Sequence, residues 1–117
     1  MIQFKFDCIF YYVSDIEKSI SFYKNVLGFR LISRDIIARF DADGVLFELV
    51  PCSDKSKIGG YGNARLCLKV DDIQDAIDHL KIKGVHTADL HEVANGFLVP
   101  CYDPDENEII LWQYKKL

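Results

Sequence analysis

A twelve-residue segment occurs twice in this chain, and this repeat restricts the folds that the chain can adopt. The copy that begins at Val13 and the copy that begins at Val70 share Val, Asp, Ile, Ile and Lys at matching places, at a constant offset of 57 residues (70 − 13 = 57). A period of this length that is repeated once is typical of two copies of one supersecondary module, because a solenoid needs about three or more units to bury a continuous core. The sequence therefore predicts a tandem duplication.

The composition argues against several classes of protein. The chain has 117 residues, of which 27% are charged, and a net charge of −4. Each half is too short to hold a core of its own, so we expect the two modules to share one. The negative charge gives no basic surface for nucleic acid, and no run of residues reaches the roughly 18 apolar positions of a membrane span. We therefore expect a cytoplasmic protein that binds neither nucleic acid nor membrane.

The cysteines indicate free thiols. The chain has four of them, widely separated and without Cys-x-x-Cys spacing, which argues against a structural zinc site and against a redox pair. An even number also allows two disulfides, but no feature of the sequence suggests secretion. The four are Cys8, Cys52, Cys67 and Cys101.

The first module, residues 1–51, is predicted to fold as β-α-β-β-β. Alternation over 6–13 predicts a strand, with Cys8, Phe10 and Tyr12 on one face. The run from Ser14 to Glu17 fits a capping box, so a helix is expected to begin after Ser14 and to end at Gly28. The three strands that follow are expected at 29–35, 37–41 and 44–50.

The second module repeats this pattern. Residues 52–63 are linker-like, and the module is expected at 64–117. Its first strand, 65–70, alternates between an apolar and a more polar face. A helix is expected from the Asp71-Asp72 cap to Gly84. The remaining strands are expected at 85–93, 96–102 and 108–114.

Three features of the chain resemble the glyoxalase/bleomycin-resistance/extradiol-dioxygenase superfamily, also called the vicinal oxygen chelate (VOC) fold. They are Val-Ser-Asp-Ile-Glu-Lys-Ser-Ile-Ser-Phe-Tyr-Lys-Asn-Val-Leu-Gly-Phe at 13–29, Glu48 near the end of the first module, and Asp-Pro-Asp-Glu-Asn at 103–107. The resemblance implies a single α+β VOC domain over residues 1–117, in which two tandem β-α-β-β-β modules form a curved mixed sheet around a cleft.

The same resemblance locates the usual metal site. In metal-dependent relatives four strands each supply one ligand, usually His, Glu or Gln, to a divalent ion. By the spacing of the family, the four positions are Cys8, Glu48, Arg65 and Ile110. Only Glu48 matches, because a guanidinium cannot ligate a metal and an isoleucine has no donor atom. The resemblance therefore implies no metal and no other cofactor, and it points to the metal-free branch of bleomycin-binding homodimers.

Two of these positions are candidates for chemistry. The side chains of Glu48 and Arg65 are expected to converge, and an ion pair would satisfy both charges. In one interpretation the pair has the structural role alone of holding the two modules together. In the other, Arg65 binds an anionic or carbonyl group of a ligand. Both interpretations stay open, and both residues are the candidates for a catalytic role.

The cleft is expected to be aromatic. Strand alternation predicts which side chains face the cleft, and several of them are aromatic. Aromatic side chains favour flat or aromatic ligands, because they offer apolar area and offset stacking. The alternative is that these rings fill a dimer interface or the cleft itself. The predicted ligand-binding residues are Cys8, Phe10, Tyr12, Glu48, Arg65, Cys67, Tyr102, Ile110 and Trp112.

A nucleophilic or acid-base site is less well supported by the residues. The thiols of Cys8 and Cys67 are expected on the cleft side, but the spacing places no histidine to act as their base. Tyr61 and Tyr102 could transfer protons, although no motif singles them out.

Two functions follow from these considerations. The first is a metal-independent homodimer, as the resembled branch implies, that sequesters or carries an aromatic or apolar small molecule. The alternative is an enzyme of the superfamily, a lyase, isomerase, cyclase or dioxygenase. It would use acid-base chemistry at Glu48 and Arg65 or a non-standard metal site.

Overall fold

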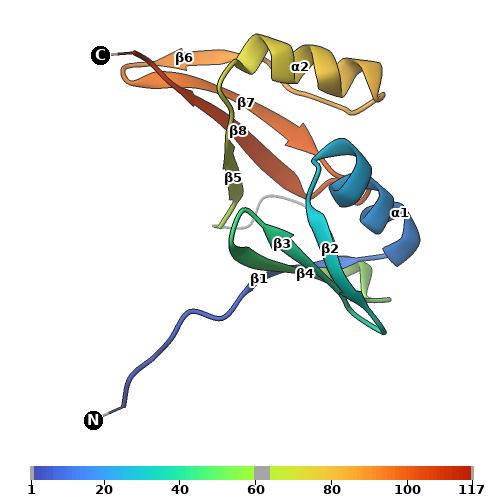
Figure 1. Cartoon of the computed structure of the whole chain (residues 1–117). Coiled ribbons are helices and arrows are strands. Elements are labelled where there is room, and N and C mark those ends of the chain that lie inside the picture. Colours follow the sequence, from blue (N-terminus) through green and yellow to red (C-terminus); the bar gives the residue numbers. More distant parts are fainter. Residues whose placement is uncertain (1, 60–63, 117) are drawn as a thin grey trace. The chain divides into compact units, whose positions relative to one another are not determined.

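The computed structural model describes residues 2–59 and 64–116, which form two compact units, Met1–Ile58 and Gly59–Leu117. Each unit contains one α-helix and a four-stranded mixed sheet, so the predicted α+β class and the β-α-β-β-β order of each module are confirmed (Figure 1). The division between the units falls inside the predicted linker, of which residues 60–63, including Tyr61, lie outside the described residues.

The first sheet has the order β1-β4-β3-β2, in which β1 is parallel to β4 and the other pairs are antiparallel. The turn between β3 and β4 contains Asp43 and Gly44, with φ of 54° and 87°, as a two-residue hairpin turn requires. The Asp41 carboxylate accepts a hydrogen bond from the Gly44 amide at 2.7 Å and fixes this turn. The strands are β1 Ile9–Val13, β2 Arg30–Arg34, β3 Ala38–Ala42 and β4 Val45–Pro51.

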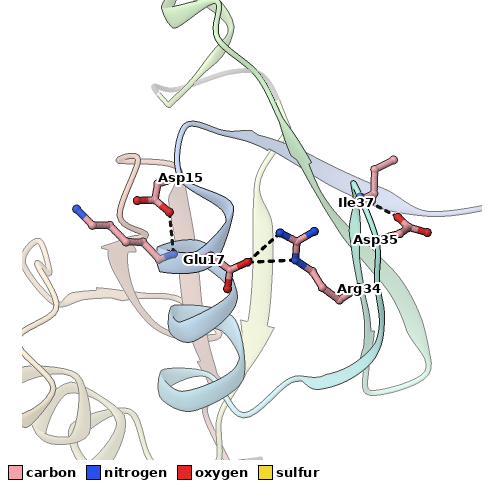
Figure 2. A network of polar contacts seen from close by, with 6 residues as sticks. Asp15, Glu17, Arg34, Asp35 and Ile37 are labelled. Carbon is pink, nitrogen blue, oxygen red and sulfur yellow. Dashed lines mark hydrogen bonds and ion pairs between the residues drawn. The ribbon is translucent and has the colours of Figure 1, made fainter.

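The helix of the first unit, α1 (Ile16–Ser21), is capped by Asp15, so the predicted cap at Ser14 is wrong by one residue. Asp15 has extended backbone, with φ of −130°, and its carboxylate accepts a hydrogen bond from the Lys18 amide at 3.2 Å (Figure 2). A carboxylate at this place also interacts favourably with the helix dipole, which a serine hydroxyl does less well.

A π-helical turn, Phe22–Val26, continues α1. In the first module Gly28 lies twelve positions after Ile16 (28 − 16 = 12), whereas in the second Gly84 lies eleven positions after Ile73 (84 − 73 = 11). The extra residue is accommodated where the Leu27 amide donates to the Phe22 carbonyl, five residues back, at 3.2 Å. A π turn therefore absorbs one inserted residue without changing the place at which the helix ends.

The core of the first unit is aromatic. Tyr23, on the π turn, is fully buried and lies 4.8 Å from the Phe47 ring and 6.4 Å from the Phe40 ring, centroid to centroid. At the surface, Glu17 of α1 accepts from Arg34 of β2 at 2.8 Å and ties the helix to an edge strand (Figure 2).

The second sheet has the equivalent order β5-β8-β7-β6, with β5 parallel to β8. Its helix, α2 (Ile73–Ile82), is capped by Asp72, and the Gln113 side chain accepts from the Ile73 amide at 2.7 Å. Helix and sheet bury an aliphatic core of Leu66, Ile73, Ile77, Leu80, Val99, Ile109 and Leu111. The strands are β5 Leu66–Lys69, β6 His91–Val93, β7 Gly96–Tyr102 and β8 Glu108–Tyr114.

The strand predicted at 85–93 is shorter than expected. Only His91–Val93 forms β6, while Thr87 makes an isolated bridge to Cys101. The residue sums of the two pairings differ by one (87 + 101 = 188, 91 + 98 = 189), so the register slips between them. Pro100 of β7 lies beside this shift in register: its carbonyl accepts from the Ala88 amide at 2.9 Å, but proline has no amide hydrogen to return a second hydrogen bond.

The turn before β8 is a polar network. Asp103, almost fully buried, accepts from the amides of Asp105 and Asn107 at 2.8 and 2.9 Å and from the Asn107 side chain at 2.9 Å. Asn107 in turn accepts from the Gly59 amide at 3.1 Å. Glu106 has φ of 63°, so the glutamate itself takes the left-handed conformation.

All four cysteines are free thiols, as predicted. Within residues 2–59 and 64–116, no helix has the length and apolar character needed to cross a membrane.

Candidate functional site

In each unit the buried side chains face the helix, and the opposite side of the sheet carries the predicted site residues. In the first sheet this open face is defined by Phe10, Tyr12, Arg39 and Glu48. In the second sheet it is defined by Cys67, Leu98, Ile110 and Trp112. The alternation of strands thus places the predicted residues that lie within strands on the expected face of their own sheet, while Cys8 and Arg65 lie just before β1 and β5.

Glu48 is the centre of the open face in the first sheet. Its side chain is only 15% exposed, and its Oε2 lies 3.3 Å from Nε of Arg39, the residue directly opposite on β3. Its other oxygen, Oε1, accepts from the Cys8 thiol at 3.7 Å. Arg39 also contacts the Asp35 carboxylate at 3.2 Å. Both oxygens of Glu48 therefore have protein partners.

Three of the four thiols have surroundings that disfavour the thiolate. Burial, together with the neighbouring Glu48 and Asp7 carboxylates, raises the pKa of the Cys8 thiol. Partial desolvation also raises the pKa of the Cys67 thiol, although this residue is exposed overall, and burial raises the pKa of Cys101 to about 12. Since the thiolate is the reactive form, these environments oppose nucleophilic catalysis.

In the second unit, Arg65 lies just before β5. Its Nε is 3.3 Å from Oε1 of Glu108, the first residue of β8, and the Glu108 side chain is only 11% exposed. Ile110 pairs with Cys67 in the β5–β8 ladder and presents only hydrocarbon to the open face. The predicted interaction between Glu48 and Arg65 stays a prediction, while each charge has a carboxylate or guanidinium partner in its own unit.

These residues do not fit the divalent metal of the family. Of the four positions predicted from the family spacing, three hold a thiol, a guanidinium and a hydrocarbon side chain, and the guanidinium of Arg39 contacts the carboxylate at the fourth. A permanently charged cation beside that carboxylate opposes the binding of a second cation. Among the described residues, no cluster of three or more His, Cys, Asp or Glu side chains could hold a metal ion.

Aromatic pairs flank the polar groups on both open faces. Phe10 and Tyr12 meet edge to face with centroids 5.3 Å apart, and Trp112 and Tyr114 do the same at 5.3 Å. A Cβ built on Gly96, on the neighbouring strand β7, would lie 2.5 Å from the indole carbon Cζ2 of Trp112. Gly96 therefore provides the space that lets the indole lie against the sheet.

Tyr102, at the end of β7, stacks on His86 with centroids 4.8 Å apart and planes inclined by 26°. The side chains of His86 and Glu106 are 67% and 66% exposed and approach to 3.7 Å. His79 and His91 are exposed as well. The three histidines are therefore exposed, in agreement with the expectation that none is placed to act as a base for Cys8 or Cys67.

Arg39 and Glu108 are the site residues that the sequence reasoning missed. Both could have been found from strand register. The Asp43-Gly44 turn sets pairs whose residue numbers sum to 87, so that Arg39 lies opposite Glu48 (39 + 48 = 87). Likewise, the β5–β8 register that pairs Leu66 with Ile109 brings the preceding residues, Arg65 and Glu108, together.

Comparisons with known proteins agree with this architecture. FosX, a fosfomycin resistance protein from Listeria monocytogenes, superposes with a TM-score of 0.82 at 17% identity, over 98% of this chain and 96% of that one. Lactoylglutathione lyase from Agrobacterium tumefaciens gives 0.76 at 16% identity, over 93% and 92%. At these identities the likeness concerns the fold alone.

TnmS3, an antibiotic binding protein from Streptomyces sp. CB03234, is more similar in sequence, with 25% identity, a TM-score of 0.77 and coverage of 98% of this chain and 99% of that one. The sequence pattern of one family matches residues 5–111, which is most of the chain. The chain belongs to the Glyoxalase/Bleomycin resistance protein/Dioxygenase superfamily.

Proposed function

We propose that this protein binds an aromatic or apolar small molecule without a metal ion. The observation that carries the proposal is the state of Glu48, the one family ligand position that is retained, whose two oxygens are engaged by Arg39 and Cys8. A carboxylate held in this way is a structural and electrostatic element of the open face rather than a vacant metal ligand.

The aromatic side chains support the class of ligand. Phe10 is 46% exposed and Tyr114 is 60% exposed, so each edge-to-face pair presents ring surface to solvent. Exposed rings beside half-buried charged groups provide apolar area for stacking and a few polar groups for orientation. The 25% identity to an antibiotic binding protein is consistent with this role.

The first test is elemental analysis of untagged protein that has not been dialysed against a chelator. We expect less than about a tenth of an equivalent of nickel, zinc, iron or manganese per chain, because Arg39 opposes cation binding at Glu48. A divalent metal at close to one equivalent would overturn the metal-independent function.

The second test is calorimetric titration with bleomycin and with 8-anilinonaphthalene-1-sulfonate as probes. We expect saturable binding of at least one probe, and Tyr12→Leu or Trp112→Leu should weaken it by about ten-fold, which corresponds to the loss of one stacking contact of about 1.4 kcal/mol. Ile82→Ala is the matched control, because Ile82 is 84% exposed and belongs to helix α2 rather than to an open face.

The two probes test the proposal in different ways. Bleomycin carries a flat heteroaromatic system, and the naphthalene sulfonate is a small apolar anion. Absence of binding by both probes, or an equal loss of affinity in Ile82→Ala, would count against the aromatic open faces as the binding surface.

A further inference from the structure

A row of side chains crosses the open face of the second sheet at the level of Trp112. The parallel ladder of β5 and β8, which lie side by side in Figure 1, sets Lys69 opposite Trp112. On its other side Trp112 lies opposite Leu98 of β7, which in turn lies opposite His91 of β6. Lys69 shares the open face with Cys67, because side chains two positions apart along a strand point the same way. The row therefore runs from a lysine on one edge strand to a histidine on the other.

The middle of the row is a surface for stacking. The six-membered ring of the Trp112 indole lies over Gly96 of β7, where a Cβ would have no room. Tyr114 meets the indole edge to face with centroids 5.3 Å apart, and it is 60% exposed. A flat ligand that stacks on the indole would thus lie over β7 and β8, with Lys69 at its β5 side.

The charge of Lys69 is not neutralised by the sheet that carries it. The residue is exposed, and in the part of the chain that the structure describes it makes no ion pair, hydrogen bond or ring contact. The four strands of the sheet contain two carboxylates, Glu92 and Glu108, and each is engaged by another cation. Nε of Arg65 lies 3.3 Å from Glu108, and Nζ of Lys115 lies 2.6 Å from Glu92.

Glu92 also belongs to the helix side of the sheet. It pairs with Phe97, which pairs with Gln113, and the Gln113 side chain accepts a hydrogen bond from the first amide of α2. The open face at the level of Trp112 therefore carries a cation beside an aromatic ring and no carboxylate. The complementary ligand group for such a surface is an anion attached to a ring.

We infer that the aromatic ligand of this protein carries an anionic group, such as a carboxylate or a sulfonate, and that Lys69 binds this group while the ring stacks on Trp112. The inference rests on the proposed function and specifies the class of its ligand. An ammonium group on a flexible stem suits this role, since it has three donors and needs no fixed geometry. The net charge of −4 disfavours an anion elsewhere on the chain, so the preference depends on this local cation.

The test compares two probes that share one ring system. The first is 8-anilinonaphthalene-1-sulfonate, and the second is N-phenyl-1-naphthylamine, which is the same molecule without the sulfonate. Fluorescence titration of the natural chain and of Lys69→Gln with both probes gives four affinities, which form a double-variant cycle. We expect Lys69→Gln to weaken binding of the sulfonate by about five-fold, the upper range for an exposed ion pair, and binding of the neutral probe by less than about two-fold.

Three further variants locate the effect. Lys69→Arg should keep the preference for the sulfonate, because it keeps the charge. Lys81→Gln removes the same charge from an exposed position of α2 and should change both affinities by less than about two-fold. His91→Gln removes the imidazole at the other end of the row and should also leave the preference in place.

Salt provides a readout that needs no substitution in the stacking surface. Raising NaCl from about 0.05 M to about 0.5 M should weaken binding of the sulfonate relative to the neutral probe in the natural chain, because salt screens an exposed ion pair. The same change should have no such effect in Lys69→Gln. A general field of the negatively charged chain would give the opposite result, since screening of a repulsion strengthens binding.

A preference for the sulfonate that survives Lys69→Gln, or an equal loss of affinity for both probes, would overturn the inference and leave the proposed function in place. Loss of the preference in His91→Gln or Lys81→Gln would also overturn it, because the anion would then be bound by another group or by the net charge. Binding that Trp112→Leu does not weaken would place the ligand on another surface. Failure of both probes to bind would likewise exclude an aromatic anion, and the titration with bleomycin then decides separately whether the proposed function holds.

Discussion

The two units share one topology and differ in almost everything that fills it. In the first, a helix with a π turn brings Tyr23 onto Phe40 and Phe47, and the core is built from rings. In the second, a regular helix of ten residues packs Ile77 and Leu80 against an aliphatic sheet. Strand order and parallel pairing are the same in both, so the fold tolerates replacement of its core as long as the pattern of faces is kept.

The open faces of the two sheets also carry different types of side chain at equivalent positions. The first sheet presents a carboxylate that is engaged by an arginine and a thiol, whereas at the equivalent place of the ladder the second presents Ile110. Phe10 pairs with Glu48 in one unit, and Cys67 pairs with Ile110 in the other. Glu48 and Ile110 therefore occupy equivalent positions of the two sheets but differ in chemistry.

The largest expected effect concerns the two cores. Phe47→Ala should lower the free energy of unfolding by about 3–5 kcal/mol, because Phe47 is buried and contacts a set of four rings. Leu111→Ala in the second unit should cost about 2–5 kcal/mol and lie below Phe47→Ala. Urea denaturation of both variants decides the order, and a smaller loss for Phe47→Ala would contradict the view that the rings form a shared cluster. The rings around Phe47 are Tyr11, Tyr23, Phe29 and Phe40.

A second prediction concerns the helices. Deletion of the exposed Asn25 from the π turn should change the free energy of unfolding by less than about 1 kcal/mol, because it restores the spacing of the second helix. Deletion of the exposed Asp78 should cost at least about 2 kcal/mol, since it rotates Leu80 off the buried face. Thermal unfolding followed by circular dichroism separates the two deletions, and equal losses would mean that the π turn does not hold an insertion.

A third prediction uses the match between Ser19 and Ala76 in the repeat. Ser19 is fully buried, and its hydroxyl has no hydrogen-bond partner among the described residues. Ser19→Ala should therefore raise the free energy of unfolding by about 1 kcal/mol, through the lost desolvation penalty and the better helix propensity of alanine. The reverse change, Ala76→Ser, should lower it by about 0.5 kcal/mol. Urea midpoints measure both, and destabilisation by Ser19→Ala would reveal a partner for the hydroxyl.

The smallest effect is the pH dependence of the first hairpin. The Gly44 amide and then Arg30 lower the pKa of the Asp41 carboxyl from 3.8. Because the folded-state pKa is the lower one, the stabilisation is complete above the ordinary pKa and disappears as the pH falls through the lowered value. Asp41→Asn should thus be slightly less stable than the natural chain at pH 7, and the difference should vanish in acid. Denaturation at pH 7 and pH 2.5 measures it, and a difference that is independent of pH would refute it.

Strand faces were predictable because their period is two whatever packs on either side. Leu66 is accordingly buried and its neighbour Cys67 exposed. The helix cap was missed by one residue, because Ser14 and Asp15 are both good caps and only the extended backbone at Asp15 decides between them. The shift in register within 85–93 was not predictable from that segment alone, because it involves the pairing with β7, where Pro100 lies.

Less of the candidate site was predictable. Family spacing located Glu48 and Arg65, but the partner of each came from hairpin and ladder register rather than from the repeat. Alternation along a strand fixes the face of a side chain but not the partner that it contacts. The contacts of Glu48 with Arg39 and Cys8 were therefore not predicted from the sequence.

The contact between Arg39 and Glu48 also has a consequence for how this chain can evolve. Building the usual ligand set of the family into this chain would take three substitutions at the predicted ligand positions, Cys8, Arg65 and Ile110. Because Arg39 holds the remaining carboxylate, a fourth change is needed before that carboxylate is released. Any one of these substitutions alone would leave an incomplete ligand set beside the Arg39 guanidinium, so a metal ion would gain a complete site only after all four positions had changed.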